Sequence, residues 1–206
     1  MEINDITAGG PRGFLGGRFL VAMPGIDDSR FARAVILVAA HSDDGAIGFI
    51  VNHPADLTIR DMFERVGLDD DVTVGPRAMR KAPTASPDEP VMRGGPVEPN
   101  RGFVLHSPDY ASASTTPLDA SLSLTSTLDV LKAIARGRGP RRAMLALGYA
   151  SWDAGQLEEE MRENVWLTAD AAMATMFEVP AANRYDAALA SLGVRAEALS
   201  GIAGNA

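Results

Sequence analysis

The chain contains no cysteine, and this absence limits its chemistry before any motif is considered. It excludes disulfide bonds, zinc sites built on thiolates, iron–sulfur clusters and any cysteine nucleophile. Aromatic residues are scarce, at 6%, but 46% of the residues are hydrophobic and 22% are charged. That balance is typical of globular proteins and excludes disorder as a description of the whole chain.

Long hydrophobic stretches are missing as well. The longest unbroken apolar run, Ala34 to Ala40, is far shorter than the roughly 18 residues that span a bilayer. The segment Met1 to Asp5 has neither the basic residues nor the apolar run of a signal peptide. We therefore expect no membrane association and a cytoplasmic location.

The chain has no excess of positive charge. Its 19 lysines and arginines stand against 27 aspartates and glutamates, giving a formal net charge of −8. An acidic protein neutralises few phosphates, so we do not expect nucleic acid as a partner. The one local basic cluster consists of Arg136, Arg138, Arg141 and Arg142.

The length of 206 residues suits one domain, and neither a repeat nor a clear linker divides it. We expect a single domain over residues 1–206. Residues 69–90 contain five prolines or glycines and charges of both signs, which predicts a surface loop excursion.

The pattern along the chain predicts strands in the first half and helices in the second. This order favours an α+β fold over a regular alternation of strands and helices. We expect Thr168 to cap a short helix that lies before Pro180. We expect strands at 18–23, 34–39, 46–51, 91–93, 102–106 and 142–147, and helices near 58–66, 125–136, 154–162 and 181–192.

The three histidines do not form a recognisable metal motif. His41 and His106 each end an apolar strand, and His53 precedes a proline in a loop. No H-x-x-x-H or H-E-x-x-H spacing occurs, so we predict no metal site and no cofactor. A strand-end imidazole that bonds to a loop backbone is the alternative explanation for His41 and His106.

Gly94 and Gly95, followed by Pro96, come directly after a predicted strand. Their backbone could approach a ligand closely or hold an anion. A tight turn that redirects the chain is the favoured explanation. Neither a phosphate-binding loop, a dinucleotide fingerprint nor a G-x-S-x-G nucleophile elbow is present.

The segment 146–161 has the densest pattern, running from a strand through a turn into a helix. Gln156 and Glu160 are four residues apart and share a helix face, next to Trp152 in the turn. They could line a polar pocket with an aromatic wall. Alternatively, Trp152 belongs to the core and Gln156 completes a capping box with Asp153.

At these residues the sequence resembles the YqgE/AlgH family of bacterial proteins. The matching blocks occur in order along nearly the whole chain: 19–24, His41 with 45–48, 51–54, 94–97, 101–106, 147–152 with 155–158, Asn164 with 166–169, and 201–204. The resemblance implies one α+β domain whose irregular, mainly antiparallel sheet folds into a pseudo-barrel flanked by helices. It implies a regulatory role but no reaction.

Two positions depart from the family pattern. Ala39 and Ala40 stand where many members have Cys-Glu before the strand-end histidine, and Asn205 stands where many have a histidine. A thiol mechanism therefore cannot apply here, and a terminal metal ligand loses its support. Residue patterns and resemblance together single out a candidate ligand pocket of His41, Asn52, Gly94, Gly95, His106, Tyr149, Trp152, Gln156 and Glu160.

Three hypotheses for function remain at this stage. The first is a non-catalytic regulatory domain that binds a small ligand or a protein partner. The second is a hydrolase or transferase that uses His41 or His106 as base with Glu160 as its partner. The third is a DNA-binding regulator, which the acidity and the missing reader motif disfavour. The absence of any spacing that pairs a nucleophile with a base favours the first over the second.

Overall fold

Ten strands form one hydrogen-bonded sheet system in the computed structural model, which describes residues 15–68, 86–126 and 128–199. Their path runs β10-β1-β2-β3-β9-β6-β8-β7, and β5 joins β9 to β4. Every pairing is antiparallel except that of β5 with β9. The strands are β1 (Arg18–Ala22), β2 (Val35–Ser42), β3 (Gly45–Ile50), β4 (Pro54–Thr58), β5 (Pro90–Arg93), β6 (Val97–His106), β7 (Thr115–Pro117), β8 (Ser123–Thr125), β9 (Ala143–Trp152) and β10 (Trp166–Asp170).

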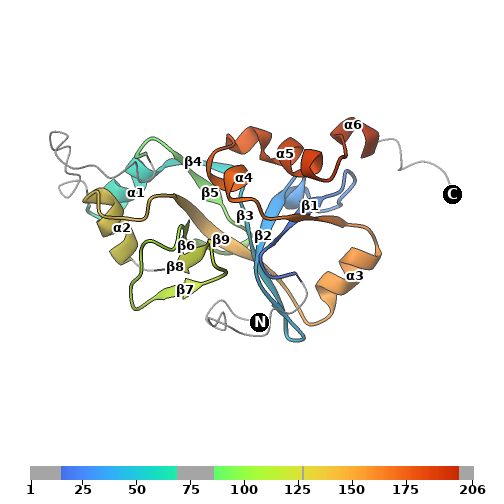
Figure 1. Ribbon diagram of the computed structural model, residues 1–206, viewed down its shortest axis with the longest axis horizontal. Helices are drawn as coiled ribbons and strands as arrows, with labels where there is room; N and C mark the ends of the chain where they lie inside the picture. The colour runs from blue at the N-terminus through green and yellow to red at the C-terminus, as the bar shows by residue number, and fades with distance from the viewer. Residues whose placement is uncertain (1–14, 69–85, 127, 200–206) are drawn as a thin grey trace.

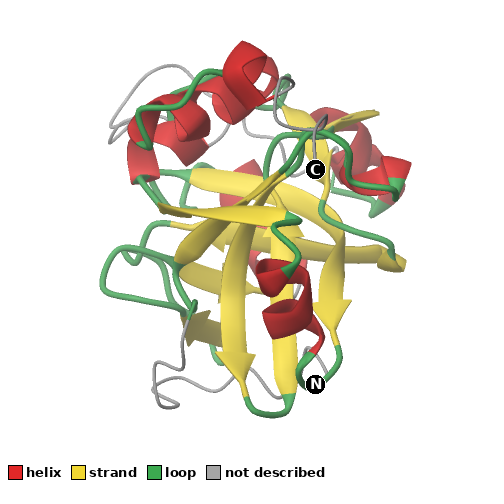
Figure 2. Ribbon diagram, turned by 90° about the vertical axis from the view of Figure 1, so that its right-hand side faces the viewer, coloured by secondary structure: helices red, strands yellow, loops and turns green. Residues whose placement is uncertain are grey.

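Short helices cover the curled sheet on several sides (Figure 1). Two lie at one end of the molecule, three lie together across another side, and one packs in front of the long strands in Figure 2. In that order they are α1 (Ile59–Arg65) and α2 (Leu128–Ala135); α4 (Met173–Phe177), α5 (Arg184–Ser191) and α6 (Ala196–Leu199); and α3 (Gln156–Arg162). Two 3-10 turns, Ser29–Phe31 and Ala181–Asn183, complete the set.

The central strands β1 and β2 are buried on both faces. Phe19, Val21 and Leu37 pack toward the side that carries α4 and α5, whereas Leu20 and Ile36 pack toward α3. Alternating side chains therefore enter two different hydrophobic clusters. This explains why the sequence shows continuous apolar runs here rather than an alternating pattern.

The helix α1 begins where the sequence predicts. The Thr58 hydroxyl accepts the backbone N–H of Asp61, and the Asp61 carboxylate accepts the backbone N–H of Thr58. This reciprocal capping box satisfies two of the N–H groups that a helix start leaves open. It fixes α1 directly after the edge strand β4.

A cluster of glycines marks the point where β9 passes from one half of the sheet to the other. The Gly94 N–H donates to the Leu147 carbonyl (2.7 Å), and the Gly94 carbonyl accepts from the Ile50 N–H (2.8 Å). A Cβ on Gly94 or Gly95 would overlap the backbone of Gly148 or Tyr149. Two backbones approach so closely here that only glycine fits.

The α+β class and the curled, mainly antiparallel sheet are confirmed, with two local corrections. Thr125 does not start a helix, because its buried side chain lies in β8 and α2 begins at Leu128. Thr168 does not cap a helix, because residues 166–170 pair with β1 as strand β10. Among the described helices, none is both long and apolar enough to cross a membrane.

Some of the predicted segments lie partly or wholly outside the described residues. Of the expected excursion 69–90, residues 69–85 lie outside the described residues, while residues 86–89 lead directly into β5. The tail block 201–204 and Asn205 also lie outside them. The strands predicted at 34–39 and 46–51 correspond to β2 and β3, which pair antiparallel through the turn between Ser42 and Gly45.

Candidate functional site

Three of the residues singled out by sequence line one cavity of about 560 Å³: Trp152, Gln156 and Glu160. The end of β9, the helix α3, the start of β10 and the loop after β1 surround it. Apolar walls come from Pro24, Ile26, Phe31, Pro96, Val165 and Trp166, and polar groups come from Asp27, Asp28, Arg30, Ser151, Glu163 and Asn164. A largely apolar hollow with a few convergent polar groups is the usual form of a small-molecule site.

The Glu160 carboxylate organises the wall of this cavity. Its Oε2 accepts the indole N–H of Trp152 (2.8 Å) and that of Trp166 (2.7 Å). Its Oε1 accepts from the Gln156 side-chain amide (2.9 Å). Both tryptophans are 97% buried and meet edge to face at 6.1 Å. The carboxylate is thus held in one orientation by three donors from three segments of the chain.

Gln156 also completes half of the capping arrangement predicted for α3. Its Oε1 accepts the backbone N–H of Asp153 (3.0 Å). The Asp153 side chain is not the cap, however, because Gly155 occupies the N-cap position with φ of 78° and no side-chain bond. A positive φ favours glycine, which has no Cβ, so the N-cap of α3 has no side chain to make the expected capping bond.

The cavity has a surplus of negative charge. Asp27, Asp28, Glu160 and Glu163 line it together with one cation, Arg30. Arg30 is already engaged, since its guanidinium makes a 2.6 Å ion pair with Asp28 that lowers the pKa of that carboxyl. Glu160 and Glu163 form no ion pair within the described part of the chain. A cation would complement this surface better than an anion.

His41 lies near α3 but is committed to another carboxylate. Its Nε2 is 2.8 Å from Glu158 Oε1, and the imidazole side chain is only 2% exposed. This bond fixes the end of β2 to α3. The prediction that Glu160 partners a strand-end histidine is therefore wrong, because Glu158 faces His41 while Glu160 faces the indoles.

His106 lies at the opposite end of β9 from this cavity, because it pairs with Ala143 while Trp152 ends the strand. Its Nδ1 is 2.8 Å from the Ser107 carbonyl, which can only accept, so Nδ1 carries the proton. Its Nε2 then accepts from the Thr125 hydroxyl (2.9 Å). Fully buried, this imidazole is a neutral structural group, and the structure does not bring it to His41.

The other four candidates also lie away from the cavity lining. Gly94 and Gly95 pack against the β9 backbone. Asn52 accepts the Val35 N–H (2.7 Å) and donates to the Arg33 carbonyl (2.8 Å), which ties the end of β3 to the start of β2. Tyr149 packs edge-on against Phe103 and donates to Glu98 (3.2 Å). Each of them holds strands or loops together.

Comparison with known proteins places the chain. The AlgH-like family model matches residues 19–197. The chain belongs to the AlgH-like family. A UPF0301 protein of Rhizobium etli is 45% identical over 208 residues, covering all of both chains, and a UPF0301 protein of Rhizobium meliloti is 48% identical over 195 residues, covering 95% of this chain and 94% of its own. The YqgE/AlgH resemblance is thereby confirmed.

Two solved structures share the fold. The solution structure of AlgH from Pseudomonas aeruginosa is 38% identical and superposes with a TM-score of 0.71, covering 97% of this chain and all of its own. A crystal structure from Corynebacterium diphtheriae has a TM-score of 0.63 at 21% identity, covering 90% of each chain, which shows the fold alone. None of these names states a reaction or a ligand.

The sequence analysis did not single out one principal residue of this cavity, Trp166. Its signal was available, because a buried indole N–H needs an acceptor and only two tryptophans exist in the chain. The described residues contain no group of three or more histidines, aspartates and glutamates that could hold a metal ion. The chemistry on offer is hydrogen bonding, negative charge and an aromatic wall.

Burial of His106 predicts a loss of stability in mild acid. Desolvation lowers the pKa of His106, against a smaller raising effect of its bond to Ser107 and of Asp109. Between that lowered pKa and about 6.5 the unfolded chain binds the proton more readily than the folded one. The free energy of unfolding should therefore fall as the pH drops below about 6.5, by at most about 1.4 kcal/mol per pH unit for this histidine.

Urea unfolding at pH 7.5 and 5.5 measures this effect, and His106→Gln should show a smaller drop between the two pH values than the wild type. Burial also lowers the pKa of His53. His53→Gln therefore serves as the matched variant, and it should reduce the drop in the free energy of unfolding independently of His106→Gln. An unchanged pH dependence in His106→Gln would contradict the assignment.

Proposed function

We propose that this AlgH-like chain is a non-catalytic regulatory domain that binds a small organic cation in the cavity lined by Trp152 and Trp166. The observation that carries this proposal is the Glu160 carboxylate, which both indole N–H groups hold at the wall of the cavity. A carboxylate fixed in advance loses little freedom when a cation binds it. The aromatic walls add attraction, because the faces of indole rings favour positive charge.

The arrangement of the histidines supports binding rather than catalysis. A general base must reach its substrate within hydrogen-bond distance. The side chain of His41 is 2% exposed and already bonded to Glu158. His106 is fully buried, and both of its nitrogens are bonded within the protein. The hydrolase or transferase alternative would need one of these imidazoles to break its bond and reach the surface.

The local basic cluster gives little support to nucleic acid as a partner. Arg141 pairs with Asp109 (3.6 Å), and Arg142 pairs with Glu178 (2.7 Å). Each pairing reduces the charge available to a phosphate. Cytoplasmic location and control of a protein partner stay predictions of the sequence.

The test uses three probes that share a ring and differ in charge: phenethylamine, phenylacetate and 2-phenylethanol. Both tryptophans of the chain line the cavity, so intrinsic tryptophan emission reports on this site directly. We expect saturable quenching by the amine, with affinity at least tenfold above that for the acid and the alcohol. A ligand at 100 times its dissociation constant should also stabilise the fold by about 2.7 kcal/mol.

Two matched variants locate the interaction. Glu160→Gln keeps an acceptor for the indoles and removes the charge, and it should weaken amine binding at least tenfold. Glu159→Gln removes a charge from the exposed side of the same helix, where Glu159 pairs with Arg162, and it should bind like the wild type. Equal binding of amine and acid, or equal binding by both variants, would refute the proposal.

A further inference from the structure

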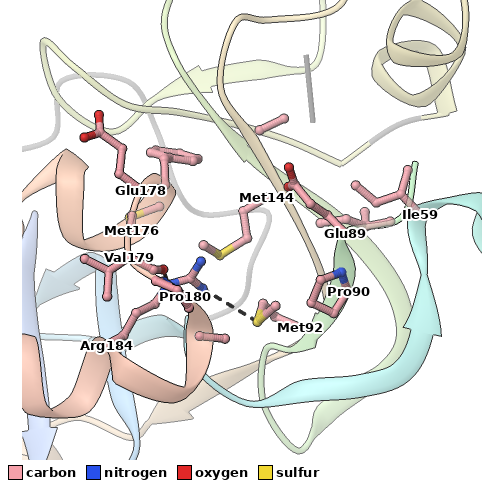
Figure 3. Close-up of a pocket in the computed structure, with 14 residues that line it drawn as sticks. Ile59, Glu89, Pro90, Met92, Met144, Met176, Glu178, Val179, Pro180 and Arg184 are labelled. Carbon is pink, nitrogen blue, oxygen red and sulfur yellow. Dashed lines mark hydrogen bonds between the residues drawn. The ribbon is translucent and has the colours of Figure 1, made fainter. Parts of the chain in front are cut away.

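A second cavity, of about 340 Å³, lies at the other end of β9 from the tryptophans, between the start of that strand and the segment from α4 to α5 (Figure 3). Its walls are mostly apolar. They are formed by Ile59, Pro90, Met92, Met144, Met176 and Phe177. Such flexible, polarisable methionine side chains adapt readily to the shape of an apolar guest.

One buried cation faces this apolar space. Arg184, the first residue of α5, is 8% exposed, and its guanidinium points toward Met92 and Met144 in Figure 3. Its Nε donates to the Val179 carbonyl (2.9 Å), and its Nη1 donates to the Val51 carbonyl and contacts the Met92 sulfur (3.8 Å). A guanidinium has five N–H donors, and these bonds leave the pair on Nη2 unused among the described residues.

Arg184 forms no ion pair with a described residue, although the charge of Glu89 raises its pKa against the effect of burial. No carboxylate of residues 15–68, 86–126 and 128–199 lies within 4.0 Å of its guanidinium. Burial lowers the pKa of Arg184 to about 10, so the side chain still carries its charge at neutral pH. A buried charge that only carbonyl groups solvate is costly, and a bound anion would offset that cost.

Two carboxylates at the edge of the cavity are occupied elsewhere. Glu178 pairs with Arg142 (2.7 Å), and in Figure 3 its carboxylate points away from Arg184. Glu89 accepts the backbone N–H of Ser86 (3.1 Å). Arg184 is therefore the one cation among the residues that line the cavity, and no lining carboxylate forms an ion pair with it.

We infer that this cavity binds a monocarboxylate with an apolar body, its carboxylate against the free edge of the Arg184 guanidinium and its body among the methionines. Planar guanidinium and carboxylate groups form paired hydrogen bonds, which suits the two unused N–H groups. The cavity holds the volume of about ten water-sized groups. A medium-chain acid fills that volume. This site is independent of the tryptophan cavity and prefers the opposite charge.

Octanoate is the probe for this site, with 1-octanol as the uncharged control of equal length. Calorimetric titration of the full chain should show one saturable octanoate site, with at least tenfold weaker binding of octanol. Tryptophan emission should not change, since neither tryptophan lines this cavity. N-acetyl-leucyl-leucine presents the same carboxylate as a peptide end, and its affinity relative to octanoate distinguishes a free acid from a chain terminus.

Three variants test the role of Arg184. Arg184→Gln should lower octanoate affinity at least tenfold. Ala181→Leu fills the cavity and leaves every bond of Arg184 intact. It should also lower octanoate affinity at least tenfold, and it provides the test if Arg184→Gln does not fold. Arg93→Gln removes an exposed cation next to Met92 on β5 and should bind like the wild type. Equal binding of octanoate and octanol, no saturable octanoate site, or unchanged affinity in Ala181→Leu would overturn the inference.

Discussion

Replacing Gly95 by alanine should cost more than about 4 kcal/mol of folding free energy, a large share of the roughly 5–15 kcal/mol that stabilises a typical domain. A Cβ at this position would overlap the carbonyl carbon and oxygen of Tyr149 and the nitrogen of Ala150. These are backbone atoms of the central strand β9, so they cannot move aside as the end of a side chain can. Only displacement of β9 from its neighbours would make room.

Circular dichroism and urea unfolding measure this loss. Gly16→Ala is the matched control, since nothing lies within 4 Å of a Cβ at Gly16. It should change the free energy of unfolding by no more than about 0.5 kcal/mol. A Gly95→Ala protein within about 1 kcal/mol of the wild type would show that β9 is far more deformable than its packing indicates.

Replacing Glu160 by leucine should destabilise the fold by about 2–6 kcal/mol, because two buried indole N–H groups lose their acceptor at about 1–3 kcal/mol each. Leucine fills a similar volume, so water gains little room to replace the carboxylate. Neither interpretation of the sequence, a pocket carboxylate or an exposed charge, predicts that removal of Glu160 costs more than about 1 kcal/mol of stability. The two estimates differ because the structure places both tryptophans against this one side chain.

Glu160→Gln separates hydrogen bonding from charge in this prediction. Its side-chain carbonyl still accepts from the indoles, so it should cost about 1 kcal/mol, the scale of one ordinary hydrogen bond. Denaturant unfolding of both variants and of Glu159→Leu, an exposed position on the same helix, provides the comparison. Equal losses in Glu160→Leu and Glu159→Leu would show that the indoles do not depend on Glu160.

Features that depend on neighbouring residues could be predicted from the sequence. The helix predicted near 58–66 begins where the structure places α1, and the capping box of Thr58 and Asp61 that fixes this start joins residues only three apart. Helical spacing correctly put Gln156 and Glu160 on one face, next to Trp152. Such features depend on a single turn of chain, and propensity and spacing describe a single turn well.

Features set by packing between distant segments were not predictable in the same way. Whether His41 meets Glu158 or Glu160 depends on how α3 rotates against β2, across 117 residues of sequence. Thr168 has the composition of a helix cap, but pairing with β1 determines its conformation. Arg184 is indistinguishable from a surface arginine until the fold surrounds it with methionines.

The central position of β9 has a consequence for synthesis of the chain. β3, β5 and β6 all pair with β9, which is complete only at residue 152, and β1 receives its outer neighbour only at residues 166–170. While the chain grows from its N-terminus, these four strands have unpaired edges, which are templates for association with other chains. A nascent chain that ends before residue 143 is therefore the aggregation-prone form of this protein, and protection of its edges by a chaperone matters most during that interval.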